Sequence, residues 1–267
     1  IVLDLKQKKA MEALHKLLET ADVFIANIRP AALERLGLGT EALRTRHKRL
    51  IVCNLMGFGR DGRYAERPAY DSIIQGMSGV AACNARIFGE PKFVPMVMMD
   101  HTVGLIATQC ILAALFHREK TGEGQAIEVP MFENAASFVL VEHMGDHTFV
   151  PPLGDWGDRR VLDPLAQPIA TKDGWICVSA NTDGQAFALF DAIGRPELKT
   201  DPRFQYPNTP EGKEQYLTDA RGFIAQVMAA APQWFSTLPK AALEVRAVEP
   251  FREATASIAF YNSPAPD

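Results

Sequence analysis

Asp100 is the residue of this sequence best placed to do chemistry. It follows an uncharged run, residues 93–99, and precedes apolar residues at helical spacing, which predicts that it stands at the start of a helix. A carboxylate at that position can cap free backbone N–H groups. The same N–H groups can instead hold an anionic intermediate that forms on a reacting carboxylate. Asp100 is therefore either a helix cap or a nucleophile.

The helix that Asp100 opens ends in a distinctive loop, the segment Arg-Glu-Lys-Thr-Gly-Glu-Gly-Gln at residues 118–125. An aspartate before a glycine-containing helix, followed by such a loop, resembles the family III CoA-transferases of the formyl-CoA transferase and carnitine CoA-transferase type. The resemblance implies that Asp100 is the nucleophile. It also implies that coenzyme A, bound as an acyl-CoA substrate, is the group that this protein handles.

A second segment carries the same resemblance. Gly57-Phe58-Gly59 is followed by residues 69–79, which include Tyr70, Asp71 and Gln75. In the family transferases an aromatic residue at the position of Tyr70 lies by the reacting thioester, with an acid beside it, so that Tyr70 is expected to be catalytic and Asp71 to contact CoA. From composition alone, Tyr70 would be an ordinary half-buried phenol.

The identity of Tyr70 also separates two reactions of this superfamily. The related α-methylacyl-CoA racemases pair a histidine at that position with the aspartate. Proton removal and return on opposite faces of a carbon needs two acid/base groups, and a tyrosine of pKa about 10 replaces histidine poorly at neutral pH. Tyr70 therefore favours transfer over racemisation.

Two further residues are expected to contact CoA by the same resemblance. Arg29 lies in an Asn-x-Arg-Pro segment after a predicted strand, and the equivalent arginine of the family contacts the CoA nucleotide. Asn181, at the exit of a predicted hairpin, faces the site in the family. The alternatives are a surface arginine that pairs with a nearby acid, and an asparagine that serves a turn or a helix cap.

The pattern of elements predicts an α/β fold. Predicted strands at residues 1–5 and 23–26 flank an amphipathic helix at residues 6–22, and further strands follow at residues 49–58 and 125–129. We expect a Rossmann-like large domain with a parallel sheet at residues 1–150, a linker at 151–166 and a smaller α+β domain at 167–267. The smaller domain should contain a hairpin turned on Asp173-Gly174, a helix at 183–193 and helices at 213–231 and 232–238.

Composition excludes several classes of protein. The net charge of −4 disfavours general nucleic-acid binding, although ten Lys and Arg against six Asp and Glu in residues 1–50 suit a phosphate-bearing ligand. We expect no membrane span, no leader and a cytoplasmic protein. Four widely spaced cysteines (Cys53, Cys83, Cys110 and Cys177) predict buried thiols, and the histidines show no metal-ligand spacing, so no metal is expected.

These observations lead to one function and three alternatives. The expected reaction is transfer of CoA from an acyl-CoA to a carboxylic acid through covalent aspartyl intermediates, in what the resemblance implies is an interlocked homodimer. The alternatives are α-methylacyl-CoA racemisation, a non-catalytic CoA-binding or assembly module and, least favoured because no Gly-x-Gly-x-x-Gly follows either of the first two predicted strands, a nicotinamide dehydrogenase. The family's first strand–helix–strand unit and last segment have no counterpart in this sequence, so we expect a fragment.

Overall fold

The structure is a computed structural model that describes residues 1–158, 161–164, 167–178, 183–201 and 236. The chain divides into two units, residues 1–162 and 163–267. The division falls inside the predicted linker at residues 151–166, so that the first part of that segment belongs to the first unit. The predicted helices at 213–231 and 232–238 lie outside the described residues, apart from Ser236.

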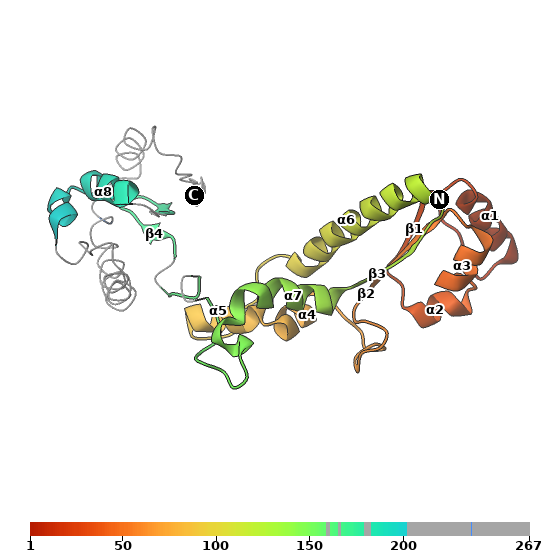
Figure 1. Cartoon of the computed structure of the whole chain (residues 1–267), viewed down its shortest axis with the longest axis horizontal. Helices are drawn as coiled ribbons and strands as arrows, with labels where there is room; N and C mark the ends of the chain where they lie inside the picture. Colours follow the sequence, from red (N-terminus) through yellow and green to blue (C-terminus); the bar gives the residue numbers. More distant parts are fainter. Residues whose placement is uncertain (159–160, 165–166, 179–182, 202–235, 237–267) are drawn as a thin grey trace. The chain divides into compact units, whose positions relative to one another are not determined.

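The first unit is an α/β structure (Figure 1). Its elements are α1 (Lys8–Leu18), β1 (Val23–Ala26), α2 (Pro30–Arg35), α3 (Thr40–Arg46), β2 (Ile51–Met56), α4 (Asp71–Ser78), α5 (Val80–Phe88), α6 (Met98–Thr121), β3 (Ala126–Pro130), α7 (Met131–His143) and the 3-10 helix η1 (Gly145–Thr148). The predicted strand at residues 1–5 is wrong. Ile1 and Val2 are fully exposed, and no strand of the described residues pairs with them.

A three-stranded parallel sheet in the order β1-β2-β3 organises this unit. Val23 of β1 lies opposite Ile51 of β2, and Val52 of β2 lies opposite Ala126 of β3. Because parallel strands need crossover connections, helices separate them: α2 and α3 follow β1, and α4 to α6 follow β2. The α/β prediction with a parallel sheet is confirmed.

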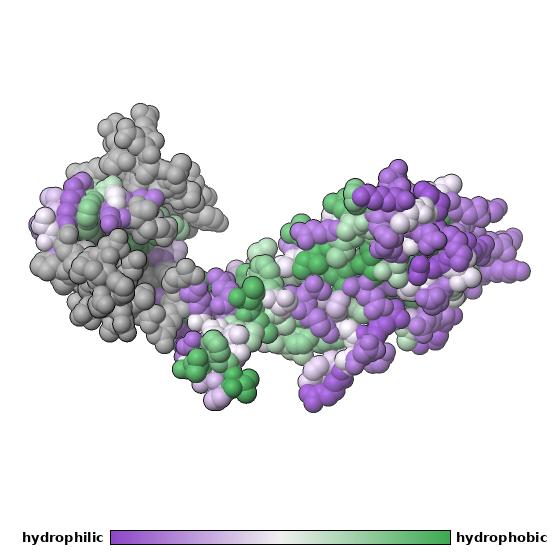
Figure 2. All heavy atoms as spheres, viewed as in Figure 1, coloured by the Kyte–Doolittle hydropathy of each residue, from purple (hydrophilic) through white to green (hydrophobic). Residues whose placement is uncertain are grey.

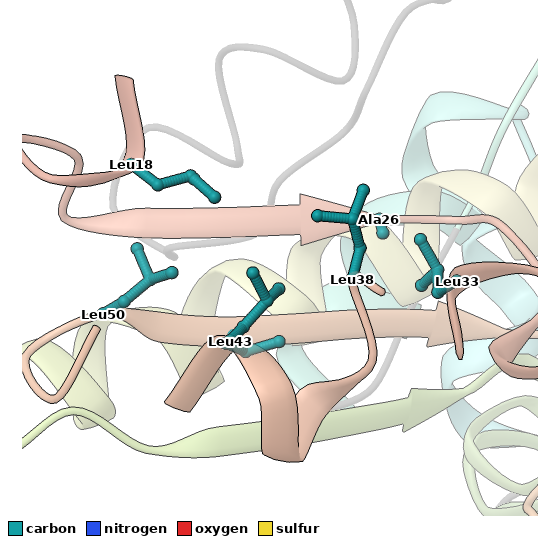
Figure 3. Close-up of a cluster of buried hydrophobic side chains, with 7 residues drawn as sticks. Leu18, Ala26, Leu33, Leu38, Leu43 and Leu50 are labelled. Atoms are coloured by element: carbon teal, nitrogen blue, oxygen red, sulfur yellow. The ribbon is translucent and has the colours of Figure 1, made fainter. Parts of the chain in front are cut away.

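The two faces of the sheet pack against different helices. Leu18 of α1, Leu33 of α2 and Leu43 of α3 gather around β1 and β2 on one side (Figure 3). On β2, Val52 belongs to this cluster. The next residue, Cys53, packs instead with Val103 and Ala107 of α6 and with Val129 of β3. Successive strand residues point to opposite faces, so α6 covers the other side of the sheet. Each fully buried leucine contributes roughly 1.5–3 kcal/mol.

Helix α6 buries only part of its apolar surface. Leu105, Leu112 and Phe116 are each at least 60% exposed, and Figure 2 shows hydrophobic residues along this helix beside the hydrophilic helices α1 to α3. By length and composition α6 is the one helix of the described residues that could cross a membrane, with 22% of its most apolar window buried. A single such helix is weak evidence for a membrane span, so the absence of a span stays a prediction.

The second unit contains a short antiparallel pair, β4 (Ile169–Ala170) with β5 (Trp175–Ile176), then α8 (Asp183–Ala192) and the 3-10 helix η2 (Pro196–Thr200). Ala170 lies opposite Trp175, so the chain reverses through Asp173 and Gly174 as predicted. The predicted helix at residues 183–193 is confirmed.

The cysteines are only partly as predicted. All four are free thiols, but Cys53 alone is buried, Cys83 and Cys110 are half-buried and Cys177 is exposed. Burial raises the pKa of the Cys53 and Cys83 thiols, which keeps them protonated at neutral pH.

Gly124 explains why the loop before β3 requires a glycine. Its N–H donates to the Lys48 carbonyl at 2.9 Å, and a Cβ built on it would lie 2.2 Å from the Leu50 carbonyl oxygen. The backbone that enters β3 therefore packs directly on the backbone that enters β2.

We predict that Gly124→Ala lowers the free energy of unfolding by roughly 1–3 kcal/mol, because the backbone must move to admit the methyl group. Urea denaturation measures this change. The matched control is Gly104→Ala in α6, where a Cβ meets no atom within 4 Å. Because alanine has a higher helix propensity than glycine, Gly104→Ala should be stabilised by up to about 1 kcal/mol. Equal changes in the free energy of unfolding at the two sites would contradict the prediction.

A histidine pair joins α1 to the end of α3. His15 Nδ1 and His47 Nε2 lie 3.3 Å apart, with the rings stacked at 5.6 Å between centroids. Burial, with Arg46 and His47 nearby, lowers the pKa of His15, although Glu19 opposes the shift. One ring nitrogen must donate and the other accept, so protonation of both rings breaks this contact.

We predict that stability falls as the pH is lowered below about 6.5, where the unfolded state binds a proton that the folded His15 resists. The slope contributed by one group is at most about 1.4 kcal/mol per pH unit. Urea denaturation between neutral and mildly acidic pH measures it. His15→Gln should flatten the profile, whereas His117→Gln, at an exposed position of α6, should leave it unchanged.

Candidate active site

Asp100 is the third residue of α6, and it does not cap that helix. The helix begins at Met98, and the residue before it is Val97, which makes no side-chain cap. The Asp100 side chain is exposed and has no hydrogen-bond or ion-pair partner among the described residues. A carboxylate in the first turn still benefits from the helix dipole. Of the two readings of Asp100, the helix cap is therefore wrong, and its carboxylate is exposed and unengaged by the described residues.

The cap of α6 comes from Asp71, at the start of α4. Asp71 Oδ2 accepts hydrogen bonds from the backbone N–H groups of Met99, at 2.6 Å, and Asp100, at 3.1 Å. Asp71 is buried, with 9% of its surface exposed. The structure places this carboxylate on the N-terminus of α6, and the expected contact of Asp71 with CoA stays a prediction.

This cap accounts for the free N–H groups of the helix start. Met98 N–H donates to the Met96 carbonyl at 2.8 Å, and His101 N–H to the Val97 carbonyl at 3.2 Å. Since Asp71 takes the two between them, all four are engaged. The interpretation that these N–H groups hold an anionic intermediate is thus not supported.

Gln75 holds the Asp71 carboxylate from the other side. Its Nε2 donates to Asp71 Oδ1 at 2.5 Å and to the Met96 carbonyl at 3.1 Å, and its Oε1 accepts from Val94 N–H at 2.8 Å. Gln75 is 1% exposed. A buried amide with these partners locks the segment before α6 onto α4.

Tyr70 lies directly before Asp71 and is 70% exposed. Its hydroxyl has no hydrogen-bond partner among the described residues. A Cβ built on Gly57 would lie 2.3 Å from the Ala69 Cβ, so the chain leaves β2 at Gly57 and returns to nearly the same point just before Tyr70. Tyr70 therefore stands by the carboxyl end of β2, where parallel α/β sheets bind ligands.

The loop between Gly57 and Ala69 is fixed by a residue that sequence analysis missed. Glu133 of α7 accepts the Gly59 N–H at 2.8 Å, and Phe132 N–H donates to the Gly57 carbonyl at 3.0 Å. An acidic residue in the first turn of a helix after a strand was the only local signal of this anchor. In the same loop Arg63 donates to the Tyr64 hydroxyl, which lowers the pKa of Tyr64.

Arg29 lies at the carboxyl end of β1, where it precedes α2. Its side chain is exposed, and among the described residues it has neither a hydrogen-bond nor an ion-pair partner, so the paired surface arginine considered above is not what the structure contains. No hydrogen bond or ion pair joins it to Tyr70, Asp71 or Asp100 in the described part of the chain. The structure brings Tyr70, Asp71 and Asp100 together and places Arg29 at the same edge of the sheet.

The remaining expected site residue, Asn181, lies outside the described residues. Within the described ranges, no group of three or more histidine, cysteine or acidic side chains could hold a metal ion.

Comparison with known proteins gives a consistent result. The model of CoA-transferase family III matches residues 1–261. The "Probable fatty acyl-CoA transferase Rv3272" of Mycobacterium tuberculosis is 31% identical over 89% of this chain and 63% of its own length. The acetyl-CoA:oxalate CoA-transferase of Acetobacter aceti is 31% identical over 92% of this chain and 63% of its own length.

Solved structures agree with the sequence relatives. A CAIB/BAIF family protein from Brucella suis has a TM-score of 0.74 and 26% identity, and the match covers 98% of this chain and 66% of that one. The chain thus spans less than two-thirds of the length of the relatives named here. Because the family model covers almost the whole sequence, the chain belongs to CoA-transferase family III.

Proposed function

We propose that this protein transfers CoA from an acyl-CoA thioester to a carboxylic acid, with Asp100 as nucleophile. The observation that carries the proposal is the exposed, unpartnered Asp100 carboxylate, fixed at the start of α6 beside the segment that bears Tyr70. Membership of a family whose named relatives are CoA-transferases supports it.

The proposed reaction is a series of acyl substitutions. The Asp100 carboxylate attacks the thioester carbonyl, which forms a mixed anhydride and releases CoA thiolate. The thiolate attacks the aspartyl carbonyl, which forms an aspartyl-CoA thioester and releases the donor acid. The acceptor carboxylate displaces the thiolate from Asp100, and the thiolate then attacks the acceptor carbonyl of the new anhydride. Acyl-CoA leaves and the Asp100 carboxylate returns, so the thioester bond energy is kept without ATP.

Two other residues have proposed roles. Tyr70, whose hydroxyl is free in the described structure, donates a hydrogen bond to the thioester oxygen as negative charge develops there. Arg29, with its unpaired guanidinium, binds a phosphate of CoA, since arginine binds phosphate in a bidentate way.

A second copy of the chain is the proposed partner. The exposed apolar side chains of α6, Leu105, Leu112 and Phe116, form the kind of surface that homodimers bury.

The first prediction for this mechanism concerns Asp100. Incubation of the full-length protein with acyl-CoA should produce an aspartyl adduct, detected by intact-mass spectrometry and mapped to Asp100 after hydroxylamine trapping. Asp100→Asn should abolish the adduct and lower the transfer rate on the order of 10⁴-fold, because an amide is not a nucleophile. The control is Asp61→Asn, an exposed aspartate of the loop before α4, which should keep both.

The same experiment separates the alternatives. CoA binding without an adduct would contradict the proposal and favour a binding module. Deuterium incorporation at the α-carbon of the acyl group without an adduct would favour racemisation.

The second prediction concerns Arg29. Arg29→Gln should raise the KM for acyl-CoA by roughly 10- to 100-fold, because a charge-assisted hydrogen bond to phosphate is lost, and should change kcat little. Arg35→Gln, at the exposed last position of α2, the helix that follows Arg29, is the matched control. Repeating the assay with dephospho-CoA thioesters, which lack the 3′-phosphate, identifies the phosphate that Arg29 binds. If the effect of Arg29→Gln on KM disappears with these substrates, Arg29 binds the 3′-phosphate. An unchanged KM with intact acyl-CoA would refute the assignment.

A further inference from the structure

Asp71 has both carboxylate oxygens engaged inside the protein. One oxygen accepts two backbone N–H groups of α6, and the other accepts the Gln75 amide. With 9% of the residue exposed, little of this carboxylate is offered to a ligand. Its negative charge is moreover the wrong sign for the phosphates of CoA.

The conformation of Asp71 is fixed by its neighbours. Gln75 is one helical turn further along α4, the spacing at which two side chains meet on one helix face. The Gln75 amide is itself fixed by Val94 and Met96, in the segment that leads into α6. The carboxylate therefore has one orientation in which all its donors are satisfied.

This carboxylate connects the two residues of the proposed chemistry. Tyr70 is the covalent neighbour of Asp71, with Cα atoms about 3.8 Å apart as in any trans peptide. Asp100 is bonded to the Asp71 side chain through its own N–H. A single side chain thus sets the backbone of Tyr70 relative to the backbone of Asp100.

We propose that Asp71 is a positioning residue, which holds the Asp100 backbone at a fixed distance from Tyr70 and does not bind CoA. This inference rests on the proposed function, in which Asp100 is the nucleophile. Gln75 has the same positioning role, because its hydrogen bond keeps the Asp71 carboxylate directed at α6. Truncation of either side chain leaves the Asp100 carboxylate itself unchanged. It removes hydrogen bonds that hold the start of α6, which carries Asp100.

The test uses the full-length protein and the variants Asp71→Ala, Asp71→Asn and Gln75→Ala. The rate of adduct formation on Asp100 is measured at saturating acyl-CoA, and the affinity for free CoA is measured by calorimetry. In Asp71→Ala the rate should fall roughly 10²-fold, as expected for a misplaced nucleophile. The affinity for CoA should stay within about twofold of the native value.

The Asp71→Asn variant, one control variant and one additional readout separate positioning from loss of stability. Asp71→Asn keeps one acceptor oxygen but opposes an N–H group to the Gln75 amide, so its rate should lie between those of native protein and Asp71→Ala. Gly124→Ala destabilises the fold away from these residues and should leave the adduct rate unchanged. Amide hydrogen exchange at Met99 and Asp100 should accelerate in Asp71→Ala and Gln75→Ala and not in Gly124→Ala.

The outcomes distinguish the two proposals. A slow adduct rate with unchanged CoA affinity and faster exchange at Met99 and Asp100 supports the positioning role. A loss of CoA affinity in Asp71→Ala with the saturated rate retained would show that Asp71 binds CoA and overturn the inference, as would an unchanged rate. If native protein forms no adduct, the proposed function fails first, whatever the exchange data show about the cap.

Discussion

The structure of the first unit depends on one buried negative charge. A carboxylate removed from water must be matched by hydrogen-bond donors, and Asp71 finds them in the N-terminus of α6 and in Gln75. Because those donors belong to α4 itself and to α6, the charge is satisfied when α4 and α6 begin side by side. The position of the two helix starts relative to each other follows from that requirement.

The elements that sequence patterns predicted well are those whose signal is local. The apolar runs of β1 and β2 and the turn at Asp173 and Gly174 gave strands at nearly the observed places. The start of α6 was located within two residues, from the spacing of its apolar side chains. Residues 1–5 carry the same apolar signal, but no strand pairs with them, and a strand requires a partner.

For the candidate site, the sequence indicated residues that lie close together but not the contacts between them. Motif resemblance selected Tyr70, Asp71 and Asp100, yet the capping bond joins residues 71 and 99, which no periodicity connects. Gln75 was part of the quoted motif, and its four-residue spacing from Asp71 was the one hint of their contact. Glu133 had no signal beyond its place in a first helical turn. Long-range polar contacts of this kind depend on the packing of the whole sheet, which a local pattern does not encode.

The contact between Gly57 and Ala69 has a consequence for how this surface can diversify. The loop from Gly57 to Ala69 begins and ends at nearly the same point, so its length can change without moving the sheet. Each doubling of the loop length costs only about 0.6 kcal/mol in closure entropy. Insertions in this loop would change the surface next to Tyr70, while the helix that carries Asp100 would keep its position. The surface beside Tyr70 can then vary separately from the start of α6.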